Sequence, residues 1–360
     1  MERPVITGAA AITALGRNLE LTREALRAGR SAILPVEGSP SPAARIGVFT
    51  TEPEMPKAKA RRLDRGSQYA VVAARQCLLA AGFEMAGREE RTGILLGTGS
   101  AGAGPLTEFE RQMAVDSPDA ASPFLFPYTV ANAPASVTAI ELGIKGPNVT
   151  IIQKDPAALN ALLYARMVLA DGRADALLVG AADEWNLVYH QGYERVRATR
   201  TATRPGFALG EGAGLVLVES AVAAAARGAT AWAVVAGVAQ RPAVVSPHKR
   251  RATPDQLRQA MEAALADAGC AASAVGLVHL QRNGVPWMDA AETAAVSEVF
   301  GERLPTLASV KLQLGENPVL GGIQLALAAD ALRADPSVGA VLVNAFGAGG
   351  NFISVVLTGC

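Results

Sequence analysis

Hydrophobic residues along the chain alternate between short, nearly continuous runs and longer stretches with helical spacing. The short runs predict buried strands, because a strand covered on both faces has no polar positions. We expect ten such strands, at Val5–Gly8, Thr92–Leu96, Val149–Ile152, Ala176–Val179, Ala213–Glu219, Trp232–Ala236, Gly276–Gln281, Thr306–Val310, Val338–Val343 and Phe352–Thr358. The longer stretches predict helices, including Asp64–Ala81, Ala157–Leu169, Pro254–Ala268, Ala290–Phe300 and Gly321–Leu332. Strands separated by helices indicate an α/β protein with a parallel sheet covered on both faces.

The second half of the chain repeats the pattern of the first. Each half has five predicted strands and ends in a glycine-rich turn that leads into a hydrophobic strand, at Gly210–Gly214 and at Gly347–Asn351. Self-similarity of this kind predicts a duplicated unit, with an N-terminal half at residues 1–225 and a C-terminal half at 226–360. No long low-complexity linker separates them, so we expect one compact body. Surface loops are expected at Ser39–Ala44 and Pro242–Thr253.

Composition narrows the classes of function. Half of the 360 residues are hydrophobic and 18% are charged, which indicates an extensive buried core. The 33 basic and 33 acidic residues balance, so nucleic acid and membrane surfaces are not expected partners. We find neither a signal peptide nor an apolar run long enough for a membrane span, and expect a cytoplasmic protein. The most basic stretch, Lys57–Arg62, is interpreted as a solvated face, with docking of an acidic partner as the alternative.

The cysteines give no sign of a metal site or a disulfide framework. Cys77, Cys270 and Cys360 are widely spaced, and neither pattern fits such spacing. Cys77 falls within a helical pattern and is expected to be a buried hydrophobe. No cofactor or metal is expected.

Short motifs of distinct sequence are distributed along the whole chain. They are Val5–Gly8 with Leu15-Gly16, Asp64-Arg65 with Ser67–Ala70, Asn132–Ala135, Gly146–Thr150, Gly206–Gly214, Asp289–Glu292, Ser309–Lys311 and Asn344–Asn351. In this order and spacing, the chain resembles the β-ketoacyl-acyl-carrier-protein synthases. The resemblance implies the thiolase fold, in which duplicated βαβαβαββ halves form five α-β-α-β-α layers.

The resemblance also assigns the catalytic positions, and each holds an unexpected residue. Synthases of this family use a cysteine at a helix N-terminus to hold the acyl chain, and two histidines to stabilise an enolate. Here the cysteine position is Asp155, the histidine positions are Gln281 and Glu316, and only Lys311 matches the family's lysine. A carboxylate forms no stable thioester, and an amide cannot transfer a proton. We therefore expect no catalytic residues for condensation.

Some of these residues also have structural interpretations. Asp155 precedes a proline and is expected to cap the helix that starts near Pro156. Lys311 is expected to pair with Asp155 or Glu316, because a lone buried carboxylate is costly. His279 shares a strand face with Gln281 but lies roughly 6–7 Å back along the chain, too far to replace the missing histidine.

Retained scaffold with lost catalytic residues predicts a subunit like a chain length factor, which pairs with an active ketosynthase paralogue, lines its acyl tunnel and serves acyl carrier protein. The family pairs its subunits through the strand before the nucleophile, here Val149–Ile152, with Phe124–Val137 reaching towards the partner. Tunnel-lining candidates are Phe109, Gln112, Met113, Phe126, Tyr128 and, in place of the family's gating phenylalanine, Ala348. Two alternatives stay open: an enzyme that uses Asp155, Glu316 and Lys311 for acid–base chemistry on an acyl thioester, and a homodimeric scaffold.

Overall fold

The computed structural model describes residues 3–243, 254–317, 319–347 and 349–360. Its main feature is a ten-stranded sheet in the order β11-β10-β12-β13-β9-β1-β8-β6-β4-β5. Those strands are β1 (Val5–Ile12), β4 (Thr92–Thr98), β5 (Asn148–Ile152), β6 (Ala176–Asp183), β8 (Gly212–Glu219), β9 (Ala233–Pro242), β10 (Val275–His279), β11 (Thr306–Ala308), β12 (Ala340–Gly347) and β13 (Asn351–Thr358). All ten strands predicted from the hydrophobic runs are present.

Helices connect most of these strands, and the five that were predicted are among them. They are α1 (Leu19–Arg27), α2 (Lys57–Ala60), α3 (Arg65–Ala80), α4 (Ala103–Arg111), α5 (Ala133–Leu142), α6 (Ala157–Ala170), α7 (Leu187–Arg195), α8 (Ala221–Ala226), α9 (Pro254–Ala268), α10 (Pro286–Phe300), α11 (Lys311–Leu314) and α12 (Leu320–Ala334). No helix of the described ranges is both long and apolar enough to cross a bilayer.

The sheet consists of two sets of five strands with the same topology. In the first set β4 runs parallel to β5 and β6, and β8 lies antiparallel between β6 and β1. In the second, β10 runs parallel to β11 and β12, and β13 lies antiparallel between β12 and β9. The sets meet where β1 pairs with β9 through Val5–Val234 and Ile6–Ala233. The predicted duplication is therefore confirmed.

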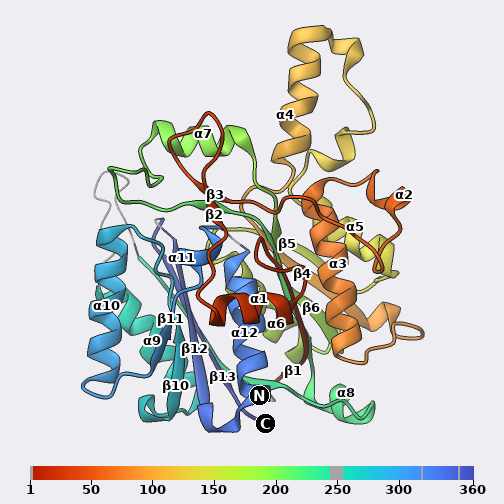
Figure 1. The fold of residues 1–360 in the computed structure, drawn as a ribbon. Coiled ribbons are helices and arrows are strands. Elements are labelled where there is room, and N and C mark those ends of the chain that lie inside the picture. Colours follow the sequence, from red (N-terminus) through yellow and green to blue (C-terminus); the bar gives the residue numbers. More distant parts are fainter. Residues whose placement is uncertain (1–2, 244–253, 318, 348) are drawn as a thin grey trace.

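The two sets of five strands lie on either side of a central pair of helices, so helices and strands alternate in five layers (Figure 1). The central layer is formed by α6 and α12, whose Leu159 and Ile323 are buried in one core with Val179 of β6 and Val343 of β12. A second core lies beneath α3, and a third lies beneath α9 and α10. This arrangement confirms the α-β-α-β-α body expected from the resemblance.

Two glycines bring α12 unusually close to the sheet. A Cβ added at Gly322 of α12 would lie 2.2 Å from the carbonyl oxygen of Gly214 in β8. A Cβ added at Gly214 would in turn lie 2.2 Å from the amide nitrogen of Ile323. Backbone-to-backbone packing of this kind fixes the height of α12 and of the loop that precedes it.

One loop prediction is wrong, and one falls outside the described residues. Within Ser39–Ala44, Ser41 is buried and Ala43–Ala44 forms β3, which joins β2 (Ile33–Leu34) and β7 (Leu209–Gly210) in a small second sheet. Ala43 and Ala44 are buried because β7, remote in sequence, pairs with β3. The loop expected at Pro242–Thr253 lies, beyond Ala243, outside the described residues.

An arm that was not predicted rises from the layered body at α4 (Figure 1). It continues through a π-helical turn, Gln112–Asp116, and two 3₁₀ turns, Pro118–Ala120 and Phe126–Tyr128. Phe124 is 84% exposed and Phe126 is 62% exposed. The arm therefore presents aromatic surface away from the core.

Candidate functional site

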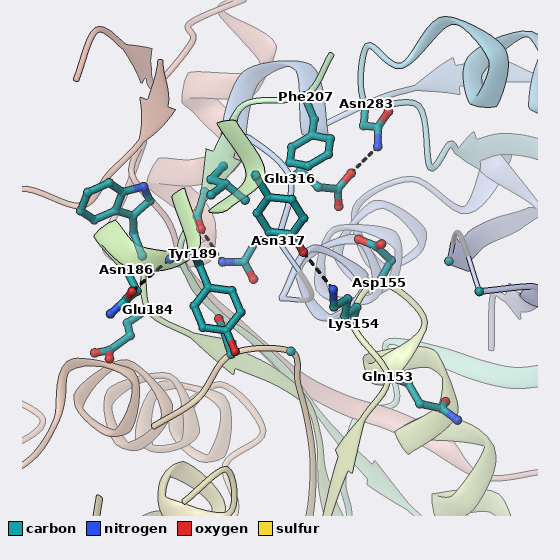
Figure 2. Close-up of a pocket in the computed structure, with 18 of the residues that line it drawn as sticks. Gln153, Lys154, Asp155, Glu184, Asn186, Tyr189, Phe207, Asn283, Glu316 and Asn317 are labelled. Carbon is teal, nitrogen blue, oxygen red and sulfur yellow. Dashed lines mark hydrogen bonds between the residues drawn. The ribbon is translucent and has the colours of Figure 1, made fainter. Parts of the chain in front are cut away.

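A cavity of about 520 Å³ lies where the parallel strands of both halves end. In α/β folds, ligand sites form at this edge of the sheet. The segments that line it follow the ends of β4, β5, β6, β10 and β12 (Figure 2). The lining residues are Gly99, Ser100, Gln153, Lys154, Asp155, Glu184, Trp185, Asn186, Tyr189, Tyr193, Phe207, Leu209, Gly210, Asn283, Met288, Glu316, Asn317, Gly347 and Gly349.

Three of the four candidate positions form one cluster at this cavity. Lys311 Nζ donates to Asp155 Oδ1 at 3.2 Å and to Glu316 Oε1 at 2.6 Å. The Lys311 side chain is 1% exposed, whereas Asp155 and Glu316 line the cavity. The other Glu316 oxygen, Oε2, accepts from Asn283 Nδ2 at 2.6 Å (Figure 2). The expected pairing of Lys311 with a carboxylate is therefore confirmed, with both carboxyl groups as partners.

The three groups of this cluster shift one another's pKa values. Burial is the largest single influence and would raise the pKa of Asp155, but the charge of Lys311 and the hydrogen bonds to the carboxylate together outweigh burial and keep that pKa below its ordinary value. Burial, together with the negative charge of Asp155, raises the pKa of Glu316 well above its ordinary value. Burial would lower the pKa of Lys311, but the two carboxyl groups raise it. These shifts favour the ionised forms of Asp155 and Lys311 and the protonated form of Glu316.

The expectation that Asp155 caps α6 is wrong. The cap position is Pro156, and no side chain accepts from the first amides of the helix. The carboxylate turns instead to Lys311, because pairing with a buried ammonium is worth more than a cap, whose loss costs only about 1 kcal/mol.

The fourth candidate, Gln281, does not line the cavity. It is buried just beyond β10, where its backbone amide donates to Glu292 Oε1 at 2.9 Å. Its Nε2 has no hydrogen-bond partner among the described residues. Asn283, two residues further on, is the side chain of this segment that reaches Glu316. His279 ends β10 fully buried, and burial lowers its pKa to about 4.

The mid-chain glycine motif fixes the backbone of Glu316. The Glu316 amide donates to Ala208 O at 2.5 Å, and the Gly210 amide donates to Glu316 O at 3.0 Å. Gly315 has a φ of 79°, and a Cβ added there would lie only 2.7 Å from the Leu209 backbone. Only glycine fits there, so two motifs far apart in the sequence meet to aim one carboxyl group at the cavity.

An aromatic and basic wall was missed by the sequence analysis. Tyr193 and Phe207 meet edge to face with ring centroids 5.3 Å apart. Lys154 Nζ donates to the Tyr193 hydroxyl at 3.0 Å (Figure 2). Lys154 has a φ of 52°, a conformation that non-glycine residues rarely adopt outside functional or over-determined sites. The available signal was the placement of Lys154 directly before Asp155.

The predicted tunnel residues lie elsewhere. Phe109, Gln112, Met113, Phe126 and Tyr128 belong to the α4 arm, and none of them lines the cavity of the single chain. The Phe109 and Phe126 rings are 5.8 Å apart. Ala348 lies outside the described residues. Their part in a tunnel stays a prediction.

None of the three cysteines is among the described residues that line the cavity, so none is placed to act as a nucleophile there. Cys77 is fully buried within α3, where burial raises the pKa of its thiol. Neither Cys270 nor Cys360 is among the described residues that line the cavity. Within the same described ranges, no group of three or more His, Cys, Asp or Glu side chains is placed to hold a metal ion.

Comparison with known proteins agrees with this architecture. Residues 1–224 match the model for the β-ketoacyl synthase N-terminal domain, and residues 232–335 match the model for its C-terminal domain. The chain is 30% identical over 323 residues to 3-oxoacyl-[acyl-carrier-protein] synthase 2 of Vibrio cholerae, covering 83% of this chain and 78% of that one.

Solved structures superpose along the whole chain. The ishigamide ketosynthase/chain length factor matches with a TM-score of 0.89 at 25% identity, covering 100% of both chains. A β-ketoacyl synthase from Burkholderia phymatum gives the same values. Together with the matches to both domain models, these likenesses establish that the chain belongs to the β-ketoacyl synthase family.

Proposed function

We propose that this chain is a ketosynthase-like subunit that forms no carbon–carbon bonds itself and pairs with an active synthase, as a chain length factor does, during elongation of carrier-bound acyl chains. The observation that carries the proposal is the ion pair between Asp155 and Lys311. A carboxylate held in this way at the nucleophile position cannot store an acyl group as a thioester. Gln281 and Glu316 likewise replace the two histidines that stabilise an enolate.

The free edge of the sheet supports the pairing. β5 ends the sheet order, so one side of its backbone has no neighbouring strand among the described residues. Ile152 of β5 is 63% exposed, and Ile140 of α5 is 78% exposed. An exposed strand edge beside large apolar side chains is a surface that proteins usually cover with a partner.

The α4 arm supports a tunnel role within such a pair. Met113, Phe124 and Phe126 are exposed on it, although Phe126 also packs against Phe109. We propose that the arm packs against the synthase partner and that Phe109 and Phe126 limit the length of the acyl chain there.

Basic side chains support acyl carrier protein as the second partner. Arg195 ends α7, and Arg197, Arg200 and Arg204 lie between α7 and β7, close in sequence to the lining residues Tyr193 and Phe207. Within the described ranges, none of these arginines forms a salt bridge with a carboxylate. The stretch Lys57–Arg62 adds exposed charge at α2. The Vibrio relative is named for acyl carrier protein, an acidic partner that such surfaces fit.

Co-expression with a candidate synthase that retains its cysteine and histidines tests the proposal. We expect the two chains to co-purify and to make a product of defined length by mass spectrometry. Ile152→Asp should abolish co-purification by placing charge in the buried interface, whereas Leu79→Asp, equally apolar and 82% exposed on α3, should leave it intact. Co-purification that survives Ile152→Asp, or products unaffected by omitting this chain, would contradict the proposal.

A further inference from the structure

The cavity floor presents two carboxyl groups and keeps the amine behind them. Asp155 and Glu316 line the cavity, whereas Lys311, which binds both, does not. Asp155 retains 18% of its side-chain exposure, so water or a ligand reaches it. Lys311 is therefore a positioning residue: its ammonium binds both carboxyl groups and is not available as a nucleophilic amine.

The two carboxyl groups of the pair differ in protonation: one favours the ionised form and the other the protonated form. Asp155 is ionised, because Lys311 holds its pKa down, and Glu316 is protonated, because burial and the Asp155 charge raise its pKa. The two groups are held side by side by one ammonium, since Lys311 Nζ contacts Asp155 Oδ1 at 3.2 Å and Glu316 Oε1 at 2.6 Å. A base and an acid in contact at one face of a cavity are the groups that general acid–base catalysis requires.

Weak basicity restricts which reaction the pair can assist. A carboxylate with a lowered pKa is a poor base towards a carbon-bound proton, so abstraction next to a carbonyl is disfavoured. A weaker base is enough to activate water for attack on a thioester, because the thioester carbonyl carbon is already electrophilic. We propose that the Asp155–Glu316 pair hydrolyses acyl thioesters that enter the cavity, with Asp155 as general base and Glu316 as general acid. This activity goes beyond the proposed pairing role and does not depend on it.

The atoms balance without another reactant. Asp155 takes a proton from water while the water oxygen attacks the thioester carbonyl carbon. The carbon–sulfur bond breaks, and Glu316 gives its proton to the departing thiolate. Asp155 then loses the gained proton to water in the cavity, and Glu316 takes one up from the same water. The products are a carboxylic acid and a thiol, and the cluster returns to its starting state.

The test uses the purified full chain and octanoyl-pantetheine as the probe. The chain is first treated with iodoacetamide and desalted, which silences any cysteine-dependent synthase that co-purifies but leaves a carboxylate intact. Thiol release is then followed with a thiol reagent, and octanoate by mass spectrometry. We expect release that survives alkylation, falls about 100-fold in Asp155→Asn and at least about 10-fold in Glu316→Gln. Asp175→Asn, a matched change in an exposed ion pair with Arg91, should leave the rate unchanged.

Two further readouts separate catalysis from a structural effect. In ¹⁸O-labelled water under single-turnover conditions, general-base catalysis places the label only in octanoate, whereas any label in the protein would show that an anhydride of Asp155 formed and was opened at the Asp155 carbonyl. The rate should also fall at high pH, where Glu316 loses its proton. Because the two variants act on different groups, either one that folds carries the test. A folded wild-type chain that releases no thiol above the uncatalysed rate, release lost on alkylation, or label found in the protein each overturns the assignment.

Discussion

Lys311 Nζ lies 2.6 Å from Glu316 Oε1, and the two side chains are 1% and 9% exposed. Lys311 begins α11, and Glu316 follows directly after that helix ends at Leu314 and turns at Gly315. The same ammonium reaches Asp155 at the start of α6. One lysine thus links the loops of both halves.

Removing the ammonium should destabilise the fold strongly. Lys311→Met leaves Asp155 and Glu316 facing each other without a counter-charge, and loss of one partner of a buried pair costs about 3–5 kcal/mol. Urea unfolding at pH 7.5 measures the change. The matched control is Lys59→Met, whose lysine is 60% exposed in its pair with Glu141 and should change the free energy of unfolding by less than about 1 kcal/mol. Equal effects of the two substitutions would mean that the cluster is not a buried ionic unit.

Close packing of α12 gives a second test. Gly322→Ala places a methyl group 2.2 Å from the Gly214 carbonyl oxygen, so the helix must move, at a cost of about 1–3 kcal/mol. Gly192→Ala, in α7 with nothing within 4 Å of the added methyl, should instead stabilise by about 0.5–1 kcal/mol through helix propensity. Thermal unfolding followed by circular dichroism compares the two. An unchanged or raised Tm for Gly322→Ala would contradict this packing.

Most of the ten strands were predictable because burial on both faces makes the whole segment apolar, whereas β5 and β11, at the two ends of the sheet, are partly exposed. A run such as Ala176–Val179 is apolar throughout, so it needs no alternation of polar and apolar residues to be identified, wherever its neighbours lie. The burial of Ala43 and Ala44, by contrast, could not be predicted from the neighbouring sequence, because it depends on pairing with β7. This pairing forms only the two-residue strand β3, which is too short to show a periodic pattern of hydrophobic residues in the sequence.

The site was predictable in its residues but less so in its contacts. Motif spacing placed Asp155, Lys311 and Glu316 together, as the structure finds them. The helix-cap rule for Asp155 failed because it considers only the neighbouring residues, while Lys311 lies 156 positions away. The aromatic wall escaped notice for the same reason: Tyr193 and Phe207 approach each other only once α7 and β7 are folded.

His279 should be replaceable with a gain in stability. It is buried, neither ring nitrogen has a hydrogen-bond partner among the described residues, and burial lowers its pKa to about 4 from an ordinary value of 6.5. His279→Leu removes an unsatisfied polar group, which is worth about 1–3 kcal/mol at pH 7.

The gain from His279→Leu should also depend on pH. Between pH 6.5 and 4 the unfolded chain takes up a proton at this histidine and the folded chain does not, so the wild type loses stability as the pH falls through this window. The variant has no such group, and its advantage should grow on acidification. His190→Leu is the control, because it removes the contact with Ser39 Oγ at 2.9 Å and should destabilise at pH 7. Denaturant unfolding at pH 7 and pH 5 measures both variants, and an advantage that shrinks at pH 5 would contradict the assignment.

A single Asp155→Cys substitution should not restore condensation. The new thiol would stand before the N-terminus of α6 and next to Lys311, a setting that favours the thiolate. Loading is only the first half of the reaction, however. Decarboxylation of a malonyl group needs hydrogen-bond donors for the enolate, whereas Glu316 brings a second potential negative charge and Gln281 does not line the cavity.

We expect the variant, purified alone, to be alkylated by iodoacetamide at the introduced thiol and yet to form no extended acyl product from octanoyl and malonyl carrier proteins. Alkylation shows that the thiol is accessible, so the missing product then isolates the enolate step. An extended product from this single variant would mean that the cavity still supplies those donors, and that the chain lost only its nucleophile.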